Sequence, residues 1–197
     1  MHVESKKDTI KSFYRQVDSH YLVANLDQCL GCGKCVGNCP VAAVSPSYNS
    51  RQIIRDVLAG QRDRLLASEE IWRCFMCGGC YVACPSDIPF PLLILQLRSR
   101  AVEAGYGLKY IRPFRRFALK AREDALTFFP SEKGRERVKK LRSSIGLSPL
   151  PEVSDKAKEE YKALFDLTGS TERLNMKESD EEKPVSLLYV EGRIISE

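Results

Sequence analysis

The sequence predicts an α+β protein that is mostly α-helical and is organised around a repeated cysteine motif. The pattern C-x2-C-x2-C-x3-C-P occurs over residues 29–40 and again over residues 74–85, so that each cysteine of the second copy lies 45 positions after its counterpart. Most of the remaining chain carries apolar residues at helical spacing, interrupted by glycine and proline. A chain of 197 residues has room for one domain with helical extensions.

The spacing of the cysteines is typical of ligands to a cubic iron-sulfur cluster. Three thiolates separated by two residues each can wrap one short loop around a cube, and glycines let the loop backbone come close to it. A proline follows each fourth cysteine and turns the chain away, which frees that cysteine for a neighbouring cluster. The glycines are Gly31, Gly33, Gly78 and Gly79, and the prolines are Pro40 and Pro85.

In two-cluster ferredoxins with this spacing, the fourth cysteine of one run ligates the other cluster. The rule predicts two [4Fe-4S] clusters in a bacterial-type, ferredoxin-like core, and it uses all eight cysteines. Cluster 1 takes Cys29, Cys32, Cys35 and Cys84, and cluster 2 takes Cys74, Cys77, Cys80 and Cys39. We expect the apolar residues beside these ligands to shield the clusters; they are Leu30, Val36, Phe75, Met76, Tyr81 and Val82.

Zinc and disulfides are the alternative uses of these cysteines. Zinc sites usually pair two C-x2-C knuckles across a longer gap, whereas three close cysteines followed by C-P favour a cubane. Disulfides need an oxidising compartment, and the polar opening of the sequence has no apolar signal-peptide core. Because no apolar run approaches the roughly 20 residues that cross a bilayer, we expect a cytoplasmic protein that is not in a membrane.

Four regions are expected along the chain. Residues 1–20 form an N-terminal arm, 21–104 the two-cluster domain with a helical insert between the motifs, 105–169 a helical extension, and 170–197 an acidic tail. We expect a strand over 21–26. Within the insert, one helix begins at Asn49 or Ser50 and stops at Gly60, and a second begins near Ser68 and runs into Cys74. A helix over 92–104 follows, and Gly105 ends it.

The helical extension carries a basic belt, which we define as the basic residues between Lys109 and Arg142. That stretch has 12 basic and 4 acidic residues, whereas residues 152–197 have 7 basic and 12 acidic residues. The belt is either a docking surface or a solvated helix face, and no aromatic-basic motif accompanies it, so no nucleic-acid partner is expected. From Pro113 onward, one apolar stripe has helical spacing: Phe114, Phe117, Ala118, Ala121, Ala125 and Phe128. The apolar stretch over 185–190 and 194–195 predicts a strand that pairs with a partner or with the domain's own surface.

The sequence predicts no catalytic residue. It contains no G-x-G-x-x-G, no G-x4-G-K-[ST] and no H-E-x-x-H pattern. The two histidines, His2 and His20, are isolated, and no pair of carboxylates is placed for acid-base work. Because the clusters use every thiol, we expect the chain to move electrons rather than to transform a substrate.

The motifs and their surroundings resemble the C subunit of heterodisulfide reductase. The residues that carry the resemblance are the two cysteine runs, the approach over 71–74, the exit over 84–89 and the helical continuation, within residues 21–104. The cysteine run itself also occurs in iron-sulfur subunits of succinate, glycerol-3-phosphate and glycolate oxidoreductases. Since no cysteine follows Cys84, the sequence is similar to the split arrangement, in which a separate B subunit carries the cysteine-rich site.

The resemblance implies a relay subunit of an oxidoreductase complex. Electrons would pass from a flavin-containing A subunit through two [4Fe-4S] clusters to the B subunit, which reduces the heterodisulfide of coenzyme M and coenzyme B during methanogenesis. Such complexes are cytoplasmic and bifurcate electrons from a hydrogenase or a formate dehydrogenase. Two alternatives stay open: an equivalent relay in sulfur or sulfate metabolism, and a free-standing electron carrier or an assembly subunit of another flavoenzyme.

Overall fold

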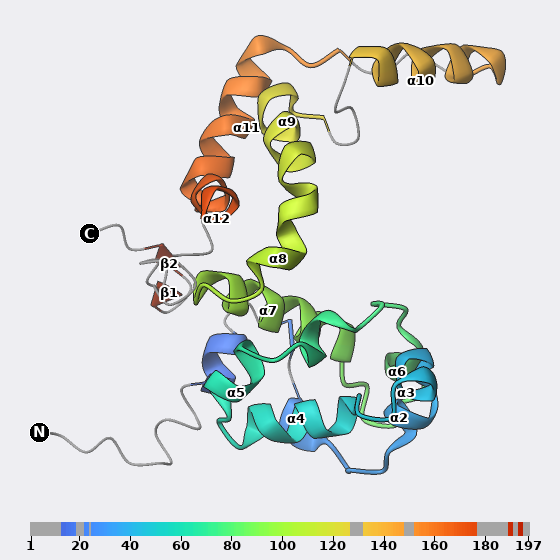
Figure 1. Ribbon diagram of the computed structural model, residues 1–197, viewed down its shortest axis with the longest axis vertical. Coiled ribbons are helices and arrows are strands. Elements are labelled where there is room, and N and C mark those ends of the chain that lie inside the picture. Colours follow the sequence, from blue (N-terminus) through green and yellow to red (C-terminus); the bar gives the residue numbers. More distant parts are fainter. Residues whose placement is uncertain are drawn as a thin grey trace, which may run out of the picture. The chain divides into compact units, whose positions relative to one another are not determined.

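The computed structural model describes residues 13–18, 22, 23, 25–126, 132–147, 152–176, 189, 190, 193 and 194, which are mostly helical (Figure 1). The helices before the second motif ends are η1 (Leu26–Gln28), α2 (Lys34–Gly37), α3 (Pro40–Val44), α4 (Ser50–Leu58), α5 (Arg62–Leu66), η2 (Glu70–Trp72) and α6 (Gly79–Val82). Those after it are α7 (Phe90–Glu103), α8 (Leu108–Ile111), η3 (Arg112–Phe114), α9 (Arg115–Asp124), α10 (Glu132–Ser144), α11 (Asp155–Leu167) and α12 (Ser170–Asn175). The η elements are 3-10 helices.

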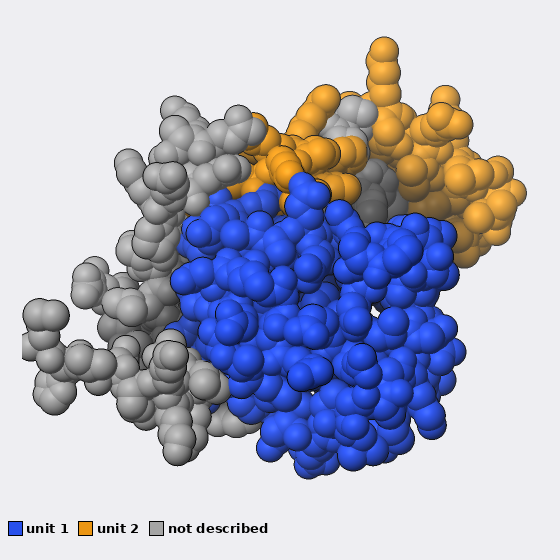
Figure 2. All heavy atoms as spheres, turned by 60° about the horizontal axis from the view of Figure 1, so that its bottom comes forward, with its two compact units in different colours: residues 1–107, 181–197 blue, residues 108–180 orange. Residues whose placement is uncertain are grey.

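The chain divides into two compact units, which Figure 2 colours separately. The first comprises residues 1–107 and 181–197, and the second comprises residues 108–180. All eight cysteines belong to the first unit.

The core of the first unit lies among α4, α5 and α7, and α5 contacts both of the other helices. Asn49 begins α4 by accepting a hydrogen bond from the backbone N–H of Gln52 at 3.0 Å, and Gly60 follows the end of the helix with a φ of 70°. The buried side chains of these three helices include Ile53, Ile54, Val57, Leu65, Leu66, Leu93, Ile94 and Leu97. Their burial holds the insert against the helix that follows the second motif.

The prediction of a strand over 21–26 is wrong for the residues of that stretch that the structure describes. Leu22 and Val23 form a turn, and Leu26 begins η1. The backbone N–H of Val23 donates to the Asp18 carboxylate at 2.8 Å instead of to a neighbouring strand, and Asn25 adopts a left-handed conformation. Val23 and Leu26 are fully buried. Their apolar character therefore reflects core packing, which sequence composition alone does not distinguish from a strand.

The second helix of the insert also differs from its prediction. The segment expected to run as a helix from near Ser68 to Cys74 contains only the three-residue η2. A helix that the sequence did not signal, α5, precedes it. Residues 13–17 are helical as well, and Phe13 and Val17 pack in the core of the first unit. The described part of the N-terminal arm thus packs on the first unit of the chain itself.

Two short strands near the C-terminus form an antiparallel pair. In β1 (Tyr189–Val190) and β2 (Arg193–Ile194), Tyr189 lies opposite Ile194 and Val190 opposite Arg193. Residues 185–188 and 195, which belong to the same predicted strand region, lie outside the described residues. The pairing of this region with a partner chain or with the domain surface stays a prediction.

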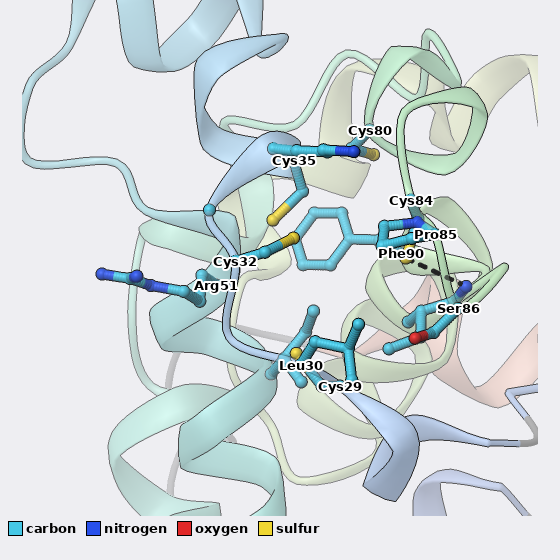
Figure 3. A pocket seen from close by; sticks show the side chains of 14 residues that line it. Cys29, Leu30, Cys32, Cys35, Arg51, Cys80, Cys84, Pro85, Ser86 and Phe90 are labelled. Carbon is cyan, nitrogen blue, oxygen red and sulfur yellow. Dashed lines mark hydrogen bonds between the residues drawn. The ribbon is translucent and has the colours of Figure 1, made fainter.

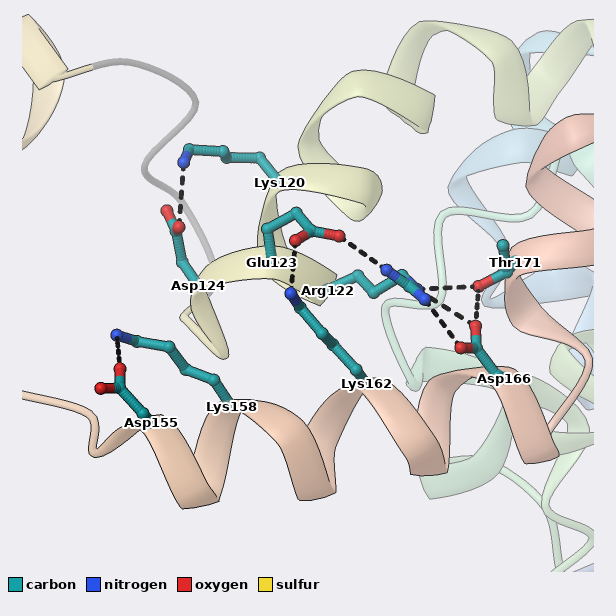
Figure 4. Close-up of polar contacts among 9 residues, drawn as sticks. All are labelled: Lys120, Arg122, Glu123, Asp124, Asp155, Lys158, Lys162, Asp166 and Thr171. Carbon is teal, nitrogen blue, oxygen red and sulfur yellow. Dashed lines mark hydrogen bonds and ion pairs between the residues drawn. The ribbon is translucent and has the colours of Figure 1, made fainter.

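In the second unit, α9 packs against α11 and α12, and polar contacts join them (Figure 4). Arg122 donates to Asp166 at 2.7 Å, and Lys162 pairs with Glu123 at 2.6 Å. These contacts lower the pKa of Asp166, chiefly through the hydrogen bond from Arg122, and that of Glu123, chiefly through the hydrogen bond from Lys162. Exposed pairs of this kind contribute little stability each, because water screens them.

The apolar stripe predicted along this helix is mostly not buried. Phe114 and Phe117 are 66% and 48% exposed, whereas Ala121 is 7% exposed. Phe128 lies outside the described residues. Two large aromatic side chains are therefore available on the surface of the second unit.

Among the described residues, no helix is long and apolar enough to span a membrane.

Gly107 supports the segment that enters the second cysteine motif. It has a φ of 74°, and a Cβ at this position would overlap Cζ2 of Trp72 and lie 2.6 Å from its Cε2. We expect Gly107→Ala to destabilise the first unit by about 2–4 kcal/mol, because left-handed strain adds to overpacking. Thermal unfolding followed by circular dichroism under anaerobic conditions measures the loss.

Gly146→Ala is the matched control for this change. Gly146 has a similar φ of 71°, but a Cβ there meets nothing within 4 Å. The control isolates the backbone strain, which costs about 1 kcal/mol. Equal losses in the two variants would contradict the close packing of Gly107 on Trp72.

Candidate iron-sulfur site

The cysteines of the first unit line two neighbouring cavities. The first cavity has sulfur-bearing walls formed by Cys29, Cys32, Cys35, Cys80 and Cys84. The second has Cys39, Cys74, Cys77 and Cys80 in its walls. Cys80 and Phe90 line both cavities. Each cavity therefore receives cysteines from both motifs, and the two cavities share a wall.

The first cavity is surrounded by side chains from opposite loops (Figure 3). Cys29, Cys32 and Cys35 approach from the first motif, and Cys84 approaches from the second, while Cys80 lies at the upper edge of the view. The apolar part of the wall includes Leu30, Ile54, Ile88 and Phe90. The four cysteines predicted for cluster 1 thus line one cavity, and the four predicted for cluster 2 line the other. The assignment of each thiolate to an iron stays a prediction.

Both motifs place their third cysteine in the same local structure. Gly33 and Gly78 have φ angles of 79° and 80°, and each is followed at once by a short helix, α2 or α6. These left-handed turns suit glycine, because a Cβ is disfavoured there. The repeat in the sequence is therefore also a repeat in the backbone.

The repeat extends to a position where the residue types differ. Gly31 has a φ of 64°, and Met76, which lies 45 positions later, has a φ of 58°. A non-glycine residue in this conformation is strained, and such strain clusters at functional sites. Gly79 serves another purpose than loop flexibility, since a Cβ on it would lie 3.3 Å from the Asn38 carbonyl oxygen. It allows the two motifs to approach each other closely.

Backbone N–H groups already point at cysteine sulfur atoms. The N–H of Met76 donates to Sγ of Cys74 at 3.3 Å, and that of Ile88 donates to Sγ of Cys84 at 3.4 Å. Burial raises the pKa of the Cys80 thiol to about 11. This thiol loses its proton when a metal binds, because coordination displaces the proton. Thiols on two facing loops, apolar walls and N–H donors toward sulfur fit a pair of iron-sulfur cubes.

The apolar neighbours of the ligands shield the clusters only in part, because Met76, Tyr81 and Val82 are exposed and line neither cavity. Leu30, Phe75 and Val82 are 72%, 75% and 87% exposed, and Met76 and Tyr81 are exposed as well. Leu30 and Phe75 border the first and the second cavity, but their side chains are largely exposed. The buried apolar walls of the cavities come from other residues, namely Val41, Tyr48, Ile54, Ile88 and Phe90.

Two arginines outside the motifs, whose role the sequence does not indicate, hold the cysteine loops. Arg98 on α7 donates to the carbonyl oxygens of Ile71 at 2.8 Å and of Cys74 at 2.7 Å, and its guanidinium lies 5.6 Å from the centre of the Trp72 ring. Arg51 on α4 donates to the carbonyl of Gly31 at 3.0 Å. Neither arginine belongs to a motif, and only their places on α4 and α7 reveal the role.

Fold and site define a two-cluster iron-sulfur protein, and residues 25–88 match the family described as 4Fe-4S dicluster domain. The chain accordingly carries two [4Fe-4S] clusters. It is 33% identical to the C2 subunit of the H2/formate:CoB-CoM heterodisulfide,ferredoxin reductase of Methanococcus maripaludis, covering 72% of this chain and 74% of that protein. It is 36% identical to the C subunit of the ferredoxin:CoB-CoM heterodisulfide reductase of Methanosarcina mazei, covering 72% of this chain and 86% of that protein. The chain belongs to the family of heterodisulfide reductase C subunits.

A third relative supports the same family. An iron-sulfur C subunit of the CoB--CoM heterodisulfide reductase of Methanocaldococcus jannaschii is 32% identical, and the match covers 73% of this chain and 74% of that protein. The similarity therefore extends well beyond the cysteine motifs.

Arg98 and Arg51 offer a reciprocal test of how the loops are held. We expect Arg98→Met to lower occupancy of the second cavity by several-fold while the first stays filled, because three carbonyls at the entrance of the second motif lose their donor. Arg51→Met should act on the first cavity instead. Iron analysis and EPR of the dithionite-reduced protein measure the two occupancies. Loss of both clusters to the same extent in both variants would contradict the separate roles.

Proposed function

We propose that this chain is the electron-relay subunit of a heterodisulfide reductase complex. The observation that carries the proposal is the shared wall of the two cavities, because clusters bound there are close enough to exchange electrons. When bound, the two clusters supply one-electron transfer at neighbouring positions. The residues of the chain hold the clusters, exclude water from one side and present the other side to partners.

The proposed partners follow from the family. Electrons enter from a flavin-containing A subunit and leave to a cysteine-rich B subunit, which reduces the CoM-S-S-CoB heterodisulfide in methanogenesis. The relatives are named as subunits of reductases that act on this heterodisulfide, and the names of the Methanococcus maripaludis and Methanosarcina mazei proteins add ferredoxin. We propose a cytoplasmic complex of this kind, in which electron bifurcation takes place on the partner subunits and this chain is a non-catalytic part of the oxidoreductase.

The proposed ligands follow the crossover rule of two-cluster ferredoxins. Cluster 1 is held by Cys29, Cys32, Cys35 and Cys84, and cluster 2 by Cys74, Cys77, Cys80 and Cys39. The walls of the two cavities support this division, because Cys84 lines only the first and Cys39 lines only the second. Cys80 lines both, and we assign it to cluster 2 with the other two cysteines of its own loop.

Replacing one cysteine of the second motif tests the crossover. We expect Cys84→Ser to damage cluster 1 and to leave cluster 2 largely intact, although Cys84 belongs to the second motif. Cys80→Ser is the matched control, since it removes a thiol from the same motif and should damage cluster 2. EPR signals and iron content after anaerobic purification read out each cluster. If Cys84→Ser removed only cluster 2, the crossover would be refuted.

The surface around the cavities suits docking of a redox partner. Leu30, Phe75 and Val82 flank the ligands and are largely exposed in the isolated chain. Exposed apolar residues of this kind mark interaction sites when they gather on one region, and a partner that covers them would also shield the clusters. This arrangement supports a subunit that works within a complex.

Fewer basic side chains of the belt are available for docking than its composition indicates. Arg115 donates to the carbonyl of Leu174 at 2.7 Å and to the Asn175 side chain at 2.6 Å, so it ties α9 to the end of α12. Arg122 and Lys120 are likewise paired within the unit. By contrast, several exposed cations form no ion pair with a described residue; they are Arg116, Lys133, Arg137 and Lys140. These four are the belt's candidate docking charges.

Anaerobic affinity purification from the native host tests the proposed complex. We expect the tagged chain to bring down a flavoprotein and a cysteine-rich protein, and the double variant Arg137→Glu with Lys140→Glu to recover at least several-fold less of one partner at low salt. Charge complementarity mainly speeds association, so the difference should shrink as salt rises. The matched control is Lys156→Glu, which reverses an exposed charge on α11 outside the belt. A monomeric protein without either partner would overturn the proposal.

A further inference from the structure

Two buried hydroxyl groups line the second cavity without a hydrogen-bond partner. Tyr48 is 1% exposed and Ser50 is 0% exposed, and neither hydroxyl makes a hydrogen bond to a described residue. Both residues belong to the wall of the second cavity. A buried hydroxyl without an acceptor costs about 1–3 kcal/mol. The two groups therefore indicate an acceptor that occupies the cavity itself.

The surroundings of Tyr48 identify the chemistry of that acceptor. The second cavity, which both hydroxyls line, also contains the thiols of Cys39, Cys74, Cys77 and Cys80. These are the four sulfur ligands proposed for cluster 2. A tyrosine or serine hydroxyl carries its proton at neutral pH and can donate it in a hydrogen bond. The acceptor that the cavity offers to these donors is therefore sulfur.

The position of Tyr48 is fixed by the fold. Its backbone N–H donates to the carbonyl of Ser45 at 2.9 Å, and its ring belongs to the core of the first unit. Ser50 is the first residue of α4, directly after the Asn49 cap. Both hydroxyls are therefore attached to parts of the structure that packing holds in place. Among the described residues that line the first cavity, no buried hydroxyl lacks a partner in this way.

We propose that the Tyr48 hydroxyl, together with that of Ser50, donates a hydrogen bond to sulfur in the second cavity and raises the reduction potential of cluster 2 above the value that its thiolates alone would set. Reduction adds one negative charge to a cluster, and a hydrogen bond to sulfur stabilises the more negative state. The effect applies to cluster 2 and not to cluster 1. It therefore contributes a difference in reduction potential between the two clusters.

This inference rests on binding of the two clusters at the two cavities and not on the identity of the electron partners. A reductase of another disulfide, or a free carrier, would show the same effect. Failure of the test below would remove the role of Tyr48 and leave the proposed relay function standing, and a different partner would leave the role of Tyr48 standing.

Tyr48→Phe tests the proposal, because it keeps the ring and removes only the hydroxyl. We expect the midpoint potential of cluster 2 to fall by the equivalent of about a tenfold change in its reduction equilibrium, which is 59 mV for one electron. The potential of cluster 1 should stay the same. EPR-monitored redox titration of the full chain measures both, and Cys77→Ser identifies the signal of cluster 2, since Cys77 lines only the second cavity.

Tyr14→Phe is the matched control. Tyr14 is partly buried against the same core but lines neither cavity. Its substitution should leave both potentials unchanged. An unchanged potential of cluster 2 in Tyr48→Phe, or equal shifts of both clusters, would overturn the proposal.

A second measurement uses the wild-type protein and therefore does not depend on the folding of a variant. In the wild-type protein, ENDOR of reduced cluster 2 in H2O and D2O should show a strongly coupled exchangeable proton. Ser50→Ala should lower the midpoint potential of cluster 2, as Tyr48→Phe does. Absence of an exchangeable proton beyond those of backbone amides would count against the hydroxyl donor.

Discussion

The convergence of eight cysteines from two facing loops on two adjacent cavities is the constraint on which the first unit depends. Each cavity takes sulfur from both motifs, so neither loop completes a site by itself. The 34 residues over 40–73 must therefore fold in a way that returns the chain to the first loop. Helices α4 and α5 perform this return, and their apolar faces pack with α7 behind the cavities. Cluster binding and folding are consequently linked, as in other proteins whose metal ligands come from distant segments.

The same constraint also holds the backbone of the cysteine loops in conformations that the sequence alone does not favour. Met76 takes a left-handed conformation at the position where the first motif uses Gly31. Arg98 and Arg51 then fix the loops by binding their carbonyl oxygens from the helices behind them. The cysteines are thus positioned by contacts from outside the motifs.

The sequence was sufficient for the chemistry of the site and insufficient for its surroundings. The spacing of the cysteines predicted two clusters, because ligand geometry restricts spacing severely. The helix after Asn49 followed from capping and periodicity, which are local properties. The strand predicted over 21–26 failed, since Val23 and Leu26 are apolar for core packing. The roles of Arg98 and Tyr48 could not be seen in advance, because they depend on contacts with residues 24 or more positions away or on a cavity that only the fold creates.

The outward side of the cluster loops connects the fold with its proposed work. The buried wall of Tyr48, Ile54, Ile88 and Phe90 isolates one side of the cavities, while Leu30 and Phe75 remain open on the other. A relay needs this asymmetry, because electrons must reach partners but the clusters must be kept from water.

Iron, acid-labile sulfide and zinc analysis of the anaerobically purified chain, with Mössbauer spectroscopy, tests the central claim most directly. The account predicts about eight irons and about eight sulfides per chain in cubane form; far fewer irons, or zinc in their place, would contradict it.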